Sequence, residues 1–244
     1  MGNIQCCFKR YEKKYLLSQE QYAAMRAGMA AHTVPDEYGC YSISNVYYDT
    51  PDYRLIRDSL EKPVYKEKLR VRSYGVPGDR DKVFVELKKK YDGVVYKRRV
   101  VMPAQDASLW LGGVREGDGS QISREIDYFM RLYQPAPKVF IAYDREAYAG
   151  AEDSELRITF DTNLRARDVD VDLRLGDCGA PLLPDGLTLM EIKIPGVAPM
   201  WLARLLSENS IYTTSFSKYG AYYQNFVLGG KRAAAIQKEV LLSA

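Results

Sequence analysis

Apolar and polar residues alternate along several short stretches of the chain. Successive side chains of a β-strand point to opposite faces, so this period of two predicts strands with one apolar and one polar face. The stretches rich in strand-forming residues are 7–16, 42–48, 65–74, 82–89, 94–102, 138–148, 155–161, 169–175 and 188–194. Asp92 and Gly93 separate two of them and predict a hairpin turn.

Apolar residues at helical spacing lie between these stretches. Ser18 caps a run to about His32 in which Tyr22, Met25 and Met29 share one face. Further helices are predicted at 107–111, 123–133, 200–208 and 217–227. Helices with one apolar face pack on a sheet, so the spacing predicts an α+β fold, an antiparallel sheet of about eight strands with helices outside.

Charged residues occupy one face of many predicted strands. Lys68, Arg70 and Arg72 share a face, while Leu69 and Val71 share the other. A polar face left in water would explain any one strand, but the pattern recurs on seven strands. The residues assigned to this face are twelve cations (Arg10, Lys14, Lys68, Arg70, Arg72, Lys88, Lys97, Arg99, Arg145, Arg157, Lys193, Lys218) and four acids (Glu12, Glu86, Asp161, Glu191).

The charged face therefore carries eight excess positive charges, although the whole chain has a net charge of only +3. The apolar faces need the helices as cover, so the cations are expected to point into a closed barrel. Like charges about 4 Å apart repel by about 4 kcal/mol at an effective dielectric constant of 20. Such an interior predicts a polyanionic ligand, because Arg forks and mobile Lys ammonium groups suit several phosphates in a row.

Carboxylates on the same face are candidates for a metal site. Glu191, together with Glu86, could hold Mg²⁺ or Mn²⁺ against phosphate oxygens, since hard divalent ions take one or two carboxylates plus substrate oxygens. The alternative is that these acids only neutralise neighbouring Lys and Arg residues.

Length and composition limit the class of protein. The chain has 244 residues, 46% of them hydrophobic and 27% charged, which predicts one globular domain over 1–244, with a core at about 8–227 and a tail at 228–244. It has no stretch apolar enough for a membrane span and no secretory signal, so a cytoplasmic location is expected. The modest net charge predicts no nucleic-acid partner, and no feature predicts a protein partner. The only histidine, His32, is expected at a helix end, away from any chemistry.

Charged motifs occur in a fixed order from residue 8 to about 225. They are Arg10-x-Glu12-x-Lys14-Tyr15, Tyr47-Tyr48-Asp49-Thr50, Lys68-x-Arg70-x-Arg72, Glu86-x-Lys88, Lys97-x-Arg99, Tyr143-x-Arg145, Arg157-x-Thr159-x-Asp161, Glu191-x-Lys193 and Ser217-Lys218-Tyr219. This ordered set resembles the VTC (vacuolar transporter chaperone) domain, the polyphosphate polymerase branch of the triphosphate tunnel metalloenzymes. The resemblance implies a closed antiparallel β-barrel of eight strands that holds ATP phosphates and a growing polyphosphate chain.

The resemblance and the charge pattern together assign roles to individual residues. Phosphoryl transfer is assigned to Lys14, Arg70, Arg72, Lys88, Arg145, Arg157, Lys193 and Lys218. Substrate binding is assigned to Arg10, Lys68, Lys97, Arg99, Tyr143, Thr159, Ser217 and Tyr219. The metal, Mn²⁺ or Mg²⁺, is assigned to Glu191 and Glu86.

The first strand distinguishes subfamilies. Hydrolytic relatives carry Glu-x-Glu-x-Lys there, whereas Arg10 stands in place of the first Glu, which removes a metal ligand and favours transfer to phosphate over hydrolysis. The expected function is a polyphosphate polymerase that transfers the γ-phosphate of ATP to inorganic polyphosphate. Two alternatives remain open: an inorganic or nucleoside triphosphatase using the same tunnel, and a non-catalytic polyphosphate-binding module.

Overall fold

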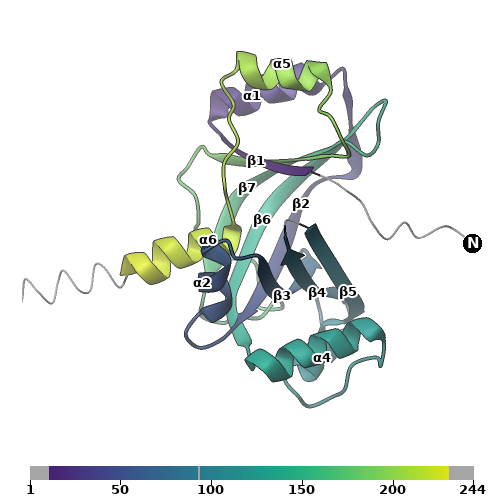
Figure 1. Cartoon of the computed structure of the whole chain (residues 1–244), viewed down its shortest axis with the longest axis vertical. Coiled ribbons are helices and arrows are strands. Elements are labelled where there is room, and N and C mark those ends of the chain that lie inside the picture. The colour runs from purple at the N-terminus through teal and green to yellow at the C-terminus, as the bar shows by residue number, and fades with distance from the viewer. Residues whose placement is uncertain (1–10, 93, 231–244) are drawn as a thin grey trace, which may run out of the picture. The chain divides into compact units, whose positions relative to one another are not determined.

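The computed structural model describes residues 11–92 and 94–230 (Figure 1). In chain order the elements are β1 (Tyr11–Leu17), α1 (Gln19–Met29), β2 (Thr33–Asp49), α2 (Arg54–Leu60), β3 (Tyr65–Tyr74), β4 (Lys82–Tyr91), β5 (Val94–Pro103), α3 (Ala104–Leu111), α4 (Gln121–Tyr133), β6 (Ala136–Gly150), β7 (Arg157–Arg167), β8 (Ala180–Pro181), β9 (Thr188–Ile194), α5 (Met200–Glu208), α6 (Lys218–Tyr222) and the π-helix η1 (Tyr223–Leu228). No helix among them is long and apolar enough to cross a membrane.

The described strands form one sheet. Their order is β1-β9-β7-β6-β2-β3-β4-β5, and the two-residue strand β8 pairs with β7 beside this path. The ladders of β3 with β4 and of β4 with β5 are antiparallel. In the part of the chain that the structure describes, β1 and β5 stand at the two ends of this order and do not pair with each other. The predicted closed barrel of eight strands is therefore wrong, because the sheet has nine strands and is open. Alternation decides which face a side chain occupies, but it does not decide whether the end strands pair.

Contacts between Cα atoms divide the chain into two compact units. The first unit is Met1–Tyr41, Tyr143–Leu164 and Leu183–Phe216, and the second unit is Ser42–Ala142, Arg165–Leu182 and Ser217–Ala244. Each unit has its own hydrophobic core. The single domain stays a prediction. Arg10, the start of the first predicted strand and residues 231–244 of the predicted tail lie outside the described residues.

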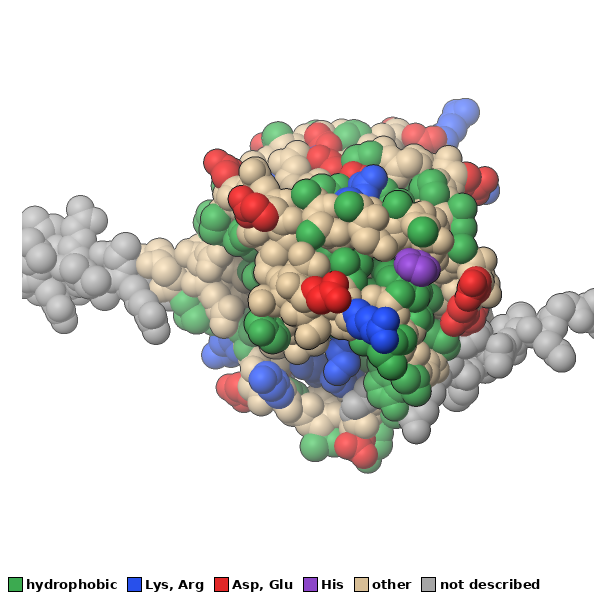
Figure 2. All heavy atoms as spheres, turned by 90° about the horizontal axis from the view of Figure 1, so that it is seen from above, with side chains coloured by type: hydrophobic (Ala, Val, Ile, Leu, Met, Phe, Trp, Pro, Cys, Tyr) green, Lys and Arg blue, Asp and Glu red, His purple; other side chains and the backbone are tan. Residues whose placement is uncertain are grey.

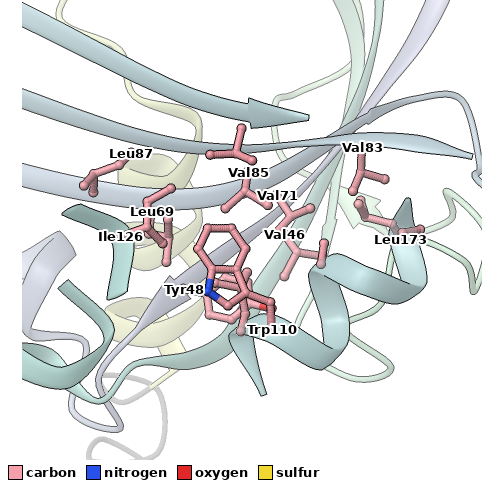
Figure 3. Close-up of a cluster of buried hydrophobic side chains, with 14 of the residues drawn as sticks. Val46, Tyr48, Leu69, Val71, Val83, Val85, Leu87, Trp110, Ile126 and Leu173 are labelled. Atoms are coloured by element: carbon pink, nitrogen blue, oxygen red, sulfur yellow. The ribbon is translucent and has the colours of Figure 1, made fainter. Parts of the chain in front are cut away.

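The core of the second unit lies on the apolar face of β3, β4 and β5. Leu69, Val85 and Leu87 are 0% exposed and belong to the same cluster as Trp110 of α3 and Ile126 of α4 (Figure 3). Ser120 caps α4 by accepting a hydrogen bond from the backbone N–H of Ser123 at 3.2 Å. The predicted pairing of apolar strand faces with amphipathic helices is confirmed here.

The core of the first unit has the same construction from other elements. Ile158 of β7 and Ile192 of β9 are fully buried against Met25 of α1 and Leu202 of α5. Ser18 and Gln21 form the capping box that starts α1, as the sequence predicted.

The histidine of the first unit lies at the surface, where it is coloured purple in Figure 2. The backbone N–H of His32 donates to the carbonyl of Met29, the last residue of α1, at 2.9 Å. Its ring stacks on Trp201, with centroids 4.5 Å apart. His32 therefore lies just after a helix end, as predicted.

One predicted strand is absent from the fold. The stretch 169–175 forms bends and turns, although its apolar and charged residues alternate. Arg167 donates to the carbonyl oxygens of Asp170 and Asp172, and also to those of Gly176 and Cys178. These carbonyls bond to one guanidinium group, so they are not available for a strand ladder.

Leu87 provides a test of the second-unit core. Leu87→Ala is expected to lower the free energy of unfolding by about 2–5 kcal/mol, because it removes buried methylene groups and leaves a cavity. Val94→Ala is the matched control, since Val94 is 52% exposed, and it should change the free energy of unfolding by about 0.5 kcal/mol or less. Urea denaturation measures both, and equal effects would contradict the assignment of Leu87 to the core.

Candidate functional site

A row of charged side chains crosses β3, β4 and β5 in the second unit. The register places Arg70 opposite Glu86, and Glu86 opposite Arg99. Tyr47 of β2 continues the row on the other side of Arg70. These residues share one face because facing positions in adjacent strands point the same way. We call this set the Glu86 row.

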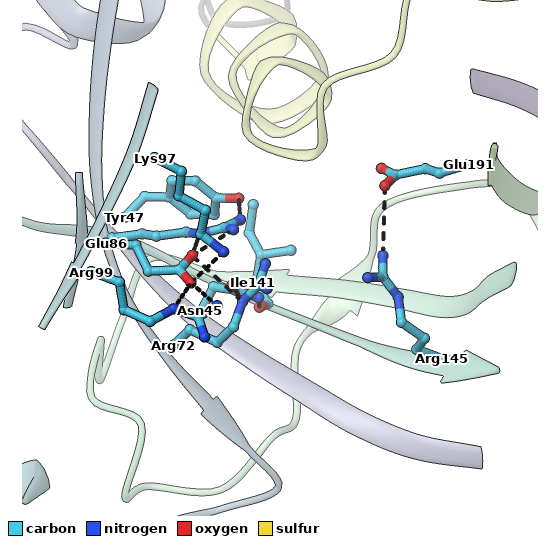
Figure 4. Close-up of polar contacts among 10 residues, drawn as sticks. Asn45, Tyr47, Arg72, Glu86, Lys97, Arg99, Ile141, Arg145 and Glu191 are labelled. Atoms are coloured by element: carbon cyan, nitrogen blue, oxygen red, sulfur yellow. Dashed lines mark hydrogen bonds and ion pairs between the residues drawn. The ribbon is translucent and has the colours of Figure 1, made fainter. Parts of the chain in front are cut away.

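Glu86 accepts hydrogen bonds through both carboxylate oxygens. Arg70 donates to Oε2 from Nε and Nη2 at 2.9 and 2.7 Å, and Arg99 donates to Oε1 from Nε and Nη2 at 3.0 and 2.7 Å (Figure 4). Lys97 Nζ lies 2.7 Å from Oε1, and Arg72 Nε lies 4.0 Å from Oε2. One carboxylate thus faces four cations.

The environment of Glu86 sets its charge. Its side chain is 1% exposed, and burial alone would raise its pKa, but Arg70, Arg72 and Lys97 outweigh burial and hold the pKa well below its ordinary value. A carboxylate has about four lone-pair positions, and the Arg and Lys donors occupy them. The geometry therefore favours the neutralising role of Glu86 over the predicted metal-binding role.

A second row consists only of lysines. Lys68, Lys88 and Lys97 lie opposite one another on β3, β4 and β5, one step along the strands from the Glu86 row. Like charges that face each other across a ladder are destabilising. Burial lowers the pKa of Lys97 to about 8, and Glu86 offsets part of that effect. An anion placed over this row would relieve the repulsion.

The start of α6 lies next to the lysine row. Ser217 caps the helix by accepting from the backbone N–H of Gly220 at 3.2 Å, and Lys68 Nζ is 3.4 Å from the Ser217 hydroxyl. Lys218 is the first residue of α6. The predicted residues Lys68, Ser217 and Lys218 are thus brought close to one another.

Asp49 belongs to one of the ordered motifs, but the sequence assigned it no role in the site. Its buried carboxylate accepts from the backbone N–H groups of Leu55 and Ile56 at 2.9 and 3.1 Å and from the Tyr219 hydroxyl at 2.8 Å. The Tyr219 ring stacks on Tyr47, whose hydroxyl accepts from Arg70 at 3.2 Å. Asp49 therefore fixes both α2, which was not predicted, and α6. The sequence signal that could have predicted α2 is an acidic residue, which can cap a helix, followed by a short amphipathic stretch.

The first unit contains a separate cluster around Glu191. The register places Lys14 and Thr159 on either side of Glu191, and Lys14 Nζ is 3.5 Å from its carboxylate. Arg145 Nη2 is 3.8 Å from Glu191 (Figure 4). Arg145 also binds Asp161 through two hydrogen bonds of 2.6 and 2.8 Å. We call these five residues the Glu191 cluster.

The polar groups of the Glu191 cluster differ in how many hydrogen-bond and charge partners they have. Burial alone would lower the pKa of Arg145, but Tyr143 and Asp161 raise it well above its ordinary value. Lys14 also donates to the carbonyl of Phe216 at 3.1 Å. The Thr159 hydroxyl is buried and has no hydrogen-bond partner among the described residues. An unpaired buried hydroxyl beside a carboxylate is unfavourable unless a ligand or water completes it.

The next row of the first unit contains two further predicted residues. Arg157 lies opposite Lys193, which lies opposite Glu12. Arg157 is exposed, and Lys193 is half-buried. The structure thus brings the predicted residues together in two sets, one in each unit, and a common cavity for both sets stays a prediction.

The donor set for a metal ion is small. Within residues 11–92 and 94–230, no group of three or more His, Cys, Asp or Glu side chains is arranged to hold a metal. Glu191 and the unpaired Thr159 hydroxyl are suitable oxygen donors. A Mg²⁺ or Mn²⁺ ion fits here only if substrate oxygens and water complete its coordination, which is usual for Mg²⁺ with phosphates.

Residues 9–227 match the family model of the VTC domain. The chain belongs to the VTC domain family. It is 27% identical over 221 residues to vacuolar transporter chaperone complex subunit 4 of Trypanosoma brucei brucei, and the alignment covers 74% of this chain and 27% of that protein. The chain thus spans about a quarter of the length of this curated relative. The family predicted from the ordered motifs is confirmed.

Two solved structures share the fold. A candidate adenylate cyclase of Bacillus halodurans has a TM-score of 0.55 at 16% identity, covering 88% of this chain and 95% of that chain. A candidate adenylyl cyclase of Hippeastrum, described as having a dominant triphosphatase activity, has a TM-score of 0.54 at 14% identity, covering 88% and 95%. At these identities the likeness concerns the fold alone.

The Glu86 row gives a testable prediction on stability. Glu86→Gln is expected to lower the free energy of unfolding at pH 7 by about 3 kcal/mol, since four cations lose their shared counter-charge. Because the folded pKa of Glu86 is depressed, wild type loses this stabilisation as the pH falls below the ordinary Glu range of about 4.3.

The difference between Glu86→Gln and wild type should therefore shrink between about pH 5 and pH 3. Urea denaturation at several pH values measures it. Glu116→Gln, at an exposed Glu of the same unit, is the control. A difference that is independent of pH would contradict the charge assignment of Glu86.

Proposed function

We propose that this protein is a polyphosphate polymerase that transfers the γ-phosphate of ATP to inorganic polyphosphate. The proposal rests on one observation above all: a single carboxylate, Glu86, is shared by four cations, and one of them, Lys97, lies in a row with two further lysines. Such an excess of positive charge suits a chain of phosphates. Membership of the VTC domain family supports the polyphosphate substrate.

In the proposed reaction, a terminal oxygen of the acceptor polyphosphate attacks the γ-phosphorus of ATP. A new P–O bond forms, the bond from the γ-phosphorus to the bridging oxygen breaks, and ADP leaves with that electron pair. The attacking phosphate is already anionic, so no general base is required. The transition state gains charge on its peripheral oxygens, and cations such as Arg70 and Arg99 would stabilise it.

We further propose that the Glu191 cluster binds the divalent ion that the reaction uses. Glu191 and Thr159 would hold Mg²⁺ or Mn²⁺ together with substrate oxygens. When bound, the ion supplies Lewis-acid neutralisation of phosphate charge. Lys14 and Arg145 already lie near the Glu191 carboxylate, and they would bind phosphate oxygens beside it.

A triphosphatase is the second candidate function. The described triphosphatase activity of the Hippeastrum protein, which shares the fold, favours it. The departure from the hydrolytic first-strand motif at Arg10 favours transfer instead.

A non-catalytic polyphosphate-binding module is the third candidate function. Cytoplasmic location and the lack of nucleic-acid and protein partners remain predictions.

The reaction products separate these candidates. Incubation with ATP and Mn²⁺ is expected to give long polyphosphate, visible on a stained gel, together with ADP. Free phosphate without polymer would support the triphosphatase, and neither product would support a binding module. Glu191→Gln should reduce polymer formation by about 100-fold or more while triphosphate binding persists, because the variant loses the metal ligand and keeps the cations. Glu208→Gln, at an exposed helical Glu, is the control.

Lys97 makes triphosphate binding dependent on pH. Its folded pKa of about 8 lies below the ordinary Lys value, so Lys97 loses its charge as the pH rises through 8. The affinity for inorganic triphosphate is expected to fall by up to about fivefold between pH 7 and pH 9. Lys97→Arg keeps its charge over this range and should remove most of that fall. Calorimetry on both proteins with the same ligand measures it, and identical pH profiles would contradict the assignment.

A further inference from the structure

Two lysines outside the predicted site extend the cationic face of the second unit. Lys66 of β3 lies opposite Lys90 of β4, which lies opposite Val95 of β5. Lys66 is two residues from Lys68, and Lys90 is two residues from Lys88, so all four side chains share a face. This Lys66–Lys90 row therefore follows the lysine row in the direction away from Glu86.

The added row is positive and has little compensation. Burial lowers the pKa of Lys66, and the nearby charges of Lys90 and Lys62 lower it further. On the opposite face of β4, Lys89 pairs with Glu67 and Glu125. By contrast, none of the ion pairs among the described residues involves Lys62, Lys66 or Lys90.

Lys66 still has donors to offer a ligand. Its Nζ donates to the carbonyl of Ser59 at 2.9 Å, which holds the ammonium group in place. An ammonium group has three N–H donors, so two remain. Lys66 and Lys90 are half-buried, and both are accessible to solvent.

The spacing of the rows indicates the size of the ligand. Rows on one face are two residues apart, about 7 Å, so the rows at Arg70, Lys68 and Lys66 extend about 14 Å along β3. Three linked phosphate groups do not reach that far. We propose that the Lys66–Lys90 row is a subsite for the polyphosphate chain beyond the three phosphates nearest the Glu86 row, a proposal that rests on the proposed function.

The residue types along the face fit this division. Arginine forks dominate the Glu86 row, where they favour one fixed geometry of phosphate oxygens. Lysines alone make up the cationic part of the two outer rows. A mobile ammonium point charge accepts phosphates at varying positions, so the outer rows suit a chain that shifts by one phosphate after each transfer.

The test compares ligands of two lengths. The double variant Lys66→Gln/Lys90→Gln is expected to bind long-chain polyphosphate about tenfold more weakly, from the loss of two solvent-accessible charge contacts, while its affinity for inorganic triphosphate stays unchanged. Lys82→Gln is the matched control, since Lys82 is an exposed lysine at the other end of β4, opposite Pro103. It should change neither affinity.

The outcomes separate this inference from the proposed function. Equal weakening for both ligands, or no change for either, would overturn the subsite while the function stands. If wild type binds neither triphosphate nor long-chain polyphosphate, the proposed function fails. Circular dichroism and the urea midpoint show whether the double variant is folded. If it is unfolded, the binding measurements are made on the two single variants instead. A smaller salt dependence of long-chain binding, at unchanged salt dependence for triphosphate, is the second expected result.

Discussion

The cationic face of the second unit depends on one buried ion network, in which the Glu86 carboxylate is shared by Arg and Lys side chains from neighbouring strands. Without that charge, the guanidinium groups of Arg70 and Arg99 would face each other across β4 uncompensated. With it, they are held in fixed orientations by paired hydrogen bonds. The network is therefore both a structural requirement of the sheet and the means by which the arginines are preorganised.

The same network leaves an excess of positive charge on the face. One acid among four cations cannot neutralise them, and the adjacent row adds more lysines. Asp161 and Arg145 of the first unit form a balanced bidentate pair instead. Within the described part of the first unit, the buried Thr159 hydroxyl has no hydrogen-bond partner. The second unit thus has a surplus of positive charge on its polar face, and the first unit has an unsatisfied buried hydroxyl among its described residues.

Sequence alternation predicted the faces of the strands well, because the period of two is a local property of the backbone. It placed Leu69, Leu87 and Ile192 in the cores and Lys68 and Arg70 on the polar face. The sequence also predicted the family, because an ordered set of motifs can be recognised even when overall sequence identity is low.

Other features could not be read because they depend on residues far apart in the chain. Tyr219 reaches Asp49 across 170 positions, and no local pattern announces that contact. The Arg167 side chain donates hydrogen bonds to the backbone carbonyls of Asp170 and Asp172, which then do not take part in strand pairing. Whether the sheet closes, and whether Glu86 binds metal or only neutralises cations, likewise depends on tertiary contacts.

The position of β5 at the end of the strand order has a consequence for solubility. A terminal strand offers free backbone groups on which a strand of another molecule could add, and β5 carries exposed Val94, Val95 and Tyr96 as well. Lys97, Arg98 and Arg99 follow directly, and like charges on an incoming copy would repel them. The basic residues of β5 are therefore expected to oppose self-association through this edge, and a saturating polyanion is expected to weaken that repulsion.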